Sequence, residues 1–159
     1  MKAKDGESPK PSQNSHRQNI NIPTIQIGDI IYVTLDQDDG LKLNKGYKTR
    51  RKYIVIIGFT DEGIAIGALL INSKIDPSKY SQELLNCQYP LLARNYRNIL
   101  EYDSWLDCSD IFELSQQKLS ERILDLKGKL IEEDRERIFQ FLKDTDVIDN
   151  ITKKRFGLI

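Results

Sequence analysis

Residues 48–73 read KTRRKYIVIIGFTDEGIAIGALLINS, and the rest of the chain is best interpreted outward from them. A basic cluster at residues 48–52 leads into the β-branched run 53–57. An Asp/Gly turn at residues 60–63 then separates this run from a second β-rich run at 64–71. Two such runs joined by a short turn predict a hairpin that is buried on both faces.

A hairpin places the start of its first strand beside the end of its second strand. We therefore expect Arg50 and Arg51 to lie near Asn72, Ser73 and Lys74, although the chain separates the two groups. Cationic donors and a hydroxyl group gathered at one end of a rigid sheet suit the binding of a phosphate.

The charge of the chain is balanced overall but unevenly distributed. The 159 residues carry no formal net charge, so total charge gives no reason to expect a nucleic-acid partner. Residues 40–100 hold ten Lys/Arg against four Asp/Glu, whereas residues 101–150 hold seven against fourteen. This asymmetry is consistent with a basic face for a polyanion, and equally with solvated surfaces of unequal sign.

Neither a metal site nor a cofactor is expected. Cys87 and Cys108 form no CxxC motif and have no nearby histidine. We interpret each as a small buried apolar residue in a reducing compartment, with a disulfide as the alternative. The sequence shows no signal-peptide core and no apolar run of membrane-spanning length, so we expect a cytoplasmic protein without a membrane partner.

The sequence divides into a tail, one domain and a C-terminal extension. Residues 1–22 are polar and should form a disordered tail, which holds the only histidine, His16. A histidine general acid or base is therefore not expected. Residues 23–146 should form a single barrel domain, and residues 147–159 a charged C-terminal extension that frays.

The domain is predicted to be mainly β with one late helix. Further strands are expected at residues 30–35, 88–93, 104–108 and 122–126, with a short polar helix or turn at 115–121. Residues 36–51 should form a long polar loop. The clearest helix covers residues 131–143, because Ile131, Ile138, Phe139 and Leu142 recur at helical spacing. Between the later strands we expect core residues, namely Tyr96, Ile99, Leu100, Tyr102 and Trp105. This pattern indicates a small barrel or strongly bent sheet capped by the helix.

The order of these features resembles the MazF/PemK-type toxins, a family of bacterial toxin–antitoxin ribonucleases. The similarity extends over roughly residues 25–143. Its motifs are the opening Gly28-Asp29-Ile30-Ile31-Tyr32-Val33, Arg51 leading into an Ile/Val strand, a strand that ends near Ser73, Tyr102-Asp103-Ser104-Trp105, and Gly128-Lys129-Leu130-Ile131-Glu132. The chain departs from the family in having Lys52 instead of proline after the arginine, and the pair Asn72-Ser73 instead of a threonine.

The resemblance implies a small SH3-like β-barrel of the plasmid-maintenance toxin type with a C-terminal capping helix. It also implies a homodimer that cleaves single-stranded RNA without a metal and is neutralised by an antitoxin protein. By position, Arg51 matches the family's catalytic arginine, and Ser73 or Asn72 matches its hydroxyl residue.

The chemistry expected for such a site can also be argued from the residues. RNA is cut when a 2′-hydroxyl attacks the adjacent phosphate, which requires charge stabilisation and proton transfer. Arg51 suits the first task, Ser73 could orient the phosphate, and Asp36 or Asp38 is the expected base. RNA contacts are expected from basic and aromatic residues around the hairpin, namely Lys48, Arg50, Lys52, Lys74, Tyr47 and Tyr53.

Other interpretations of these residues remain open. The tyrosines could be ordinary barrel packing, and the basic cluster could be a solvated strand edge that discourages aggregation. The alternative function is a catalytically inactive barrel that acts as a nucleic-acid or protein binding module. A third hypothesis is a gyrase-poisoning toxin of the same barrel type, which the basic cluster before Tyr53 favours least.

Overall fold

The predicted hairpin lies at the centre of the sheet. A computed structural model describes residues 24–39, 46–122 and 124–159. In it β2 (Thr49–Phe59) and β3 (Ala65–Asn72) pair antiparallel, with Tyr53 opposite Ile71. The basic cluster is therefore the first part of β2 and not the end of a loop. The predicted tail with His16 and the middle of the predicted loop, residues 40–45, lie outside the described residues.

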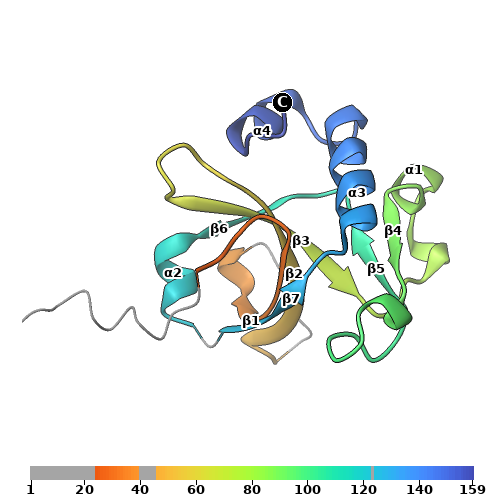
Figure 1. Cartoon of the computed structure of the whole chain (residues 1–159), viewed down its shortest axis with the longest axis horizontal. Coiled ribbons are helices and arrows are strands. Elements are labelled where there is room, and N and C mark those ends of the chain that lie inside the picture. The colour runs from red at the N-terminus through yellow and green to blue at the C-terminus, as the bar shows by residue number, and fades with distance from the viewer. Residues whose placement is uncertain (1–23, 40–45, 123) are drawn as a thin grey trace, which may run out of the picture.

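The strands and helices that the sequence predicts follow in the expected order, and shorter elements, with a C-terminal helix, lie between and after them. The strands are β1 (Asp29–Asp36), β4 (Gln88–Leu91), β5 (Ser104–Asp107), β6 (Phe112–Ser115) and β7 (Leu124–Lys129). The α-helices are α1 (Gln82–Leu85), α2 (Gln116–Ser120), α3 (Glu132–Asp144) and α4 (Asn150–Arg155). Short 3₁₀ helices are η2 (Gln37–Asp39), η3 (Pro77–Lys79) and η4 (Ala93–Asn95). In Figure 1, α2 lies on the left of the sheet and α3 on the right.

The expected barrel or strongly bent sheet is an open sheet in its hydrogen bonding, because the strands in the part of the chain that the structure describes do not close into a ring. Within the described ranges, seven strands form one antiparallel sheet, of which six follow the order β4-β5-β3-β2-β1-β7 and the seventh, β6, pairs with β3. β5 and β6 pair with different parts of β3, at Ile71–Asn72 and at Ala65–Ala68. β4 and β7 thus end up at opposite edges, and no ladder joins them among these residues. The fold is mixed α/β, with a mainly antiparallel sheet and C-terminal helices.

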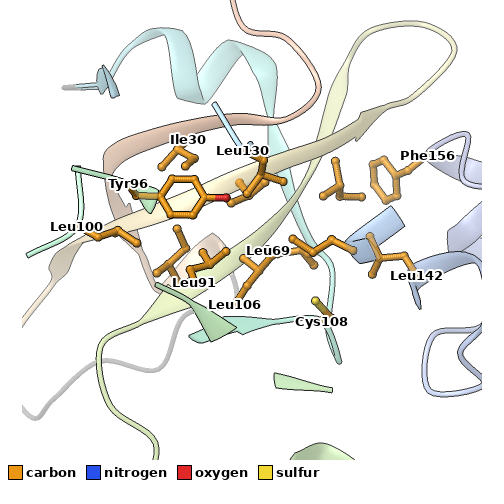
Figure 2. Packing of buried hydrophobic residues seen from close by; sticks show 14 of the residues in the cluster. Ile30, Leu69, Leu91, Tyr96, Leu100, Leu106, Cys108, Leu130, Leu142 and Phe156 are labelled. Atoms are coloured by element: carbon orange, nitrogen blue, oxygen red, sulfur yellow. The ribbon is translucent and has the colours of Figure 1, made fainter. Parts of the chain in front are cut away.

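Side chains are buried on both faces of the central hairpin, as the sequence predicts. Strand residues alternate between the faces, so Val55 and Leu69 enter one core and Ile54 and Leu70 the other. The first core, part of which Figure 2 shows, is completed by α3, by Ile148 and Phe156 on either side of α4, and by the segment around Tyr96. The second core is completed by residues of β1, β6 and α2. Each core gives the hairpin an apolar partner, which fixes its register.

The C-terminal residues do not fray as expected; they form α4 and enter the first core. Phe156 is buried, and its backbone and ring lie directly over Gly58 and Gly67. A Cβ at Gly58 would come within 2.3 Å of the Phe156 carbonyl oxygen. The two glycines therefore make room for this close approach of the C-terminal segment to the hairpin.

Candidate functional site

The candidate site lies on the face of the sheet that carries the first core, which we call the first face. It occupies the part of this face that the helices do not cover. On β2, Arg51, Tyr53 and Val55 share this face because strand side chains alternate. Val55 is buried in the first core, whereas Tyr53 is only half-buried and Arg51 is exposed. Tyr32 on β1 lies opposite Tyr53. The sheet therefore changes from an apolar to a polar and aromatic surface along one strand.

These residues line a pocket of about 360 Å³, which we call the polar pocket. Sheet residues supply Tyr32, Arg50, Arg51, Lys52, Tyr53, Ile71 and Ser104, and Ser73 follows the end of β3. The segment before β5 adds Leu100, Glu101 and Tyr102. Arg51 and Ser73, the predicted catalytic pair, are thus brought together as the hairpin geometry predicts.

The Arg51 guanidinium is held by two neighbours. Its central carbon lies 4.2 Å from the centre of the Tyr32 ring, and that ring lies 4.4 Å from the Tyr53 ring. Arg51 Nη2 donates to Asp125 Oδ2 at 2.9 Å, from the edge strand β7. A cation stacked on an aromatic ring and fixed by a carboxylate is a preorganised group for binding an anion.

Asn72 and Lys52 leave the sheet on the opposite face from Arg51. Lys52 lies opposite Val33, which belongs to the second core, and its Nζ donates to Asn72 Oδ1 at 2.7 Å. Lys52 is 7% exposed, and burial, aided by the charge of Arg50, lowers its pKa to about 8. Asn72 is therefore the partner of a buried lysine, and the predicted site residues are divided between the two faces.

The expected bases Asp36 and Asp38 are engaged elsewhere. Asp36 Oδ2 accepts from Arg122 Nη2 at 3.2 Å, and Asp36 also lies 3.8 Å from the Lys118 ammonium. Asp38 donates its backbone N–H to Asp36 Oδ1 and lies 4.0 Å from Lys118. Neither aspartate lines the polar pocket. They join the end of β1 to the corner between α2 and β7.

Three predicted RNA contacts flank the polar pocket without lining it. Tyr47 and Lys48 are exposed just before β2, and Lys74 is exposed just after Ser73. Tyr47 is 68% exposed, so it is not a packing residue of the described structure.

The pocket and its surroundings also hold residues that the sequence does not predict as site residues, among them Tyr32, Glu101, Tyr102 and Asp125. Tyr102 was expected in the core but is 64% exposed. Strand alternation places Tyr32 on the face away from the second core, which was a usable signal. Asp125 gave no such signal, because its position beside Arg51 depends on the pairing of β1 with β7.

A second and larger cavity of about 520 Å³ lies away from these groups, between α3 and the C-terminal segment. Its lining includes Phe139, Phe156 and Leu158, with Glu136 and Lys143 as the charged residues. Because one of these residues is negative and the other positive, the cavity favours neither an anionic nor a cationic ligand. The polar pocket is the better candidate because Arg51, Ser73 and three tyrosines line it together.

Comparison with known proteins adds no assignment. No family model matches the chain. No curated protein is significantly similar to it. Among the described residues, no group of three or more His, Cys, Asp and Glu side chains is placed to hold a metal ion. In the same residues, every helix is too short or too polar to cross a bilayer.

Proposed function

We propose that this chain is a metal-independent endoribonuclease of the MazF/PemK toxin type that cleaves single-stranded RNA in the polar pocket. The observation that carries the proposal is the meeting of Arg51 and Ser73 in a pocket with Tyr32, Tyr53 and Tyr102. For the fold, we propose that the bent sheet is an open, divergent form of the SH3-like barrel.

The reaction needs no group beyond the RNA, water and side chains at the site. The 2′-oxygen forms a bond to phosphorus while the bond to the 5′-oxygen breaks, which leaves a 2′,3′-cyclic phosphate and a 5′-hydroxyl. Arg51 neutralises the charge that grows on the non-bridging oxygens, and Ser73 donates a hydrogen bond to one of them. Asp125, which lies beside Arg51, takes the proton of the 2′-hydroxyl, and water protonates the 5′-oxygen. The hydroxide left by that water takes the proton from Asp125, which restores the site.

Single-stranded RNA is the substrate that the aromatic groups favour. Unpaired bases stack on exposed tyrosine rings, and each stack contributes about 1–3 kcal/mol. Tyr102 is exposed at the rim of the polar pocket, and Tyr53 is half-buried within it. A paired base would not reach either ring, because its faces are covered within the duplex.

The partners follow from the same proposal. We propose that an antitoxin protein segment covers the polar pocket and that the enzyme is a homodimer in the cytoplasm. An acidic side chain of the antitoxin would compete with the RNA phosphate for Arg51. If both oxygens of that side chain's carboxylate accepted hydrogen bonds from the Arg51 guanidinium, Arg51 could no longer bind a phosphate.

A non-catalytic RNA-binding module is the second candidate, and one observation favours it. The Arg51 guanidinium is already paired with Asp125, and the predicted bases Asp36 and Asp38 lie outside the polar pocket. Such a protein would bind RNA through salt-sensitive phosphate contacts and leave it intact.

The test is incubation of the purified chain with a long single-stranded RNA in the presence of EDTA. Discrete fragments ending in cyclic phosphate are expected, and Arg51→Ala and Ser73→Ala should each reduce their formation at least about a hundredfold. Arg94→Ala, which removes an exposed arginine outside the polar pocket, is the matched control. Intact RNA that nevertheless binds would favour the binding module, and cutting by Arg51→Ala as fast as by the control would refute this site.

A further inference from the structure

One carboxylate reaches the polar pocket from a firmly held turn. Glu101 lies between Leu100, which is buried in the first core, and the exposed Tyr102. After the turn, Asp103 Oδ1 accepts from the Ala93 N–H at 2.8 Å. Ser104 Oγ donates to the Tyr102 carbonyl at 2.9 Å. The backbone that presents Glu101 and Tyr102 is therefore fixed on both sides.

Glu101 is the acidic residue in a lining whose guanidinium on the pocket face belongs to Arg51. Its carboxylate makes no ion pair or hydrogen bond with another group in the described part of the chain. Neighbouring Asp103, by contrast, is used in a backbone hydrogen bond. A pocket built for phosphate alone gains nothing from an acid, because like charges repel. Glu101 therefore suits the part of a nucleotide that donates hydrogen bonds.

We propose that Glu101 selects an unpaired guanine for the polar pocket; the inference rests on the proposed RNA function. Guanine alone presents two adjacent donors on its Watson–Crick edge, N1–H and the N2 amino group. The two carboxylate oxygens accept both bonds, as bidentate pairs do elsewhere in base recognition. Uracil instead presents a single donor, N3–H, between two carbonyl oxygens that the carboxylate repels. Tyr102 stacks on the base while Arg51 holds the adjacent phosphate.

The size of the pocket agrees with this occupant. Its volume of about 360 Å³ lies near the lower end of small-ligand sites, which run from roughly 300 to 1,000 Å³. One nucleotide, and not a longer segment, is the unit that it takes. The flanking nucleotides then follow the exposed basic residues before β2 and after β3, which include Lys48 and Lys74.

The test measures binding of the full chain to short 2′-O-methyl RNA oligonucleotides, which the proposed reaction cannot cleave. Each is fluorescein-labelled and made of uridine, with a central guanosine, inosine, adenosine, cytidine or uridine. Fluorescence anisotropy should show guanosine bound at least about tenfold more tightly than uridine. Inosine should fall between them, because it keeps N1–H and lacks the N2 amino group.

Two variants separate base selection from general charge. Glu101→Gln should reduce the guanosine-to-uridine ratio below about threefold, because the amide accepts only one of the two bonds. Glu83→Gln, an exposed residue on α1 with the same charge change, should keep the wild-type ratio. RNA binding with equal affinity for guanosine and uridine, or an unchanged ratio in Glu101→Gln, would overturn the guanine assignment alone. Absence of binding to every oligonucleotide would overturn the proposed RNA function and this inference with it.

Discussion

Arg51 and Lys52 are neighbours in the chain, yet their side chains leave opposite faces of β2. Arg51 lies over Tyr32 on the face with the polar pocket, whereas the amine of Lys52 is buried and bonded to Asn72. Exposure keeps the guanidinium ready for an anion, and burial makes the charged form of the lysine costly. Adjacent cations in one cluster therefore have different physical roles.

The buried amine of Lys52 predicts a specific pH dependence of stability. Burial and the charge of Arg50 lower the pKa of Lys52 to about 8 from its usual 10.5. The unfolded chain holds this proton more tightly, so Lys52 destabilises the folded protein fully below about pH 8. The cost then fades as the pH rises toward 10.5.

Lys52→Met should therefore raise the free energy of unfolding at pH 7 by on the order of 1–3 kcal/mol. The gain should shrink between about pH 8 and 10, and urea unfolding at several pH values measures both quantities. Lys79→Met replaces an exposed lysine on η3 and should change little at any pH. A stability difference from the wild type that does not vary with pH would contradict the burial argument.

The junction of α3 and α4 depends on a buried lysine of a different kind. Lys153 is 4% exposed, and its Nζ donates to the carbonyl oxygens of Lys143 at 2.9 Å and Thr145 at 2.5 Å. Carbonyl groups at the end of a helix lack partners within it and carry partial negative charge. The Lys153 ammonium gives the end of α3 both a hydrogen-bond donor and a positive charge. It therefore holds α4 beside α3.

Lys153→Met should lower the free energy of unfolding by about 2–3 kcal/mol, because it removes the charged donor of the Lys143 and Thr145 carbonyl groups and both hydrogen bonds with it. The side chain keeps nearly the same length, so lost packing contributes little. Lys154→Met, at the adjacent exposed position of α4, should change stability by less than about 0.5 kcal/mol. Equal effects of the two substitutions in urea unfolding would show that the Lys153 ammonium does not hold the helices together.

Helix α3 and the central hairpin could be predicted because their patterns are local. Helical spacing of Ile138 and Leu142 and the acids in the first turn indicate α3, and both residues are buried as expected. The C-terminal helix was missed because its short sequence is mostly polar. Its position depends on Phe156 packing over Gly58 and Gly67, a contact between distant parts of the chain.

In the whole molecule, the polar pocket lies on the first face of the sheet, next to the part that the helices and the first core cover. The hairpin alone brings Arg51 and Ser73 together, and this much was predictable from one turn. Tyr32 and Asp125 join them only through the pairing of β1 with β2 and β7. The order of the strands was equally hidden, since β5 and β6 are short and pair with different parts of one edge of β3.

The most direct test of the central claim is an NMR titration of the ¹⁵N-labelled full chain with a short 2′-O-methyl RNA of mixed sequence. Both candidate functions require RNA to bind in the polar pocket, so this measurement does not depend on cleavage. The amide signals of Tyr32, Tyr53, Ser73 and Tyr102 should shift most, and less as salt is added. Unchanged signals, or shifts confined to the cavity beside Phe139 and Leu158, would contradict the assignment of the polar pocket as the RNA site.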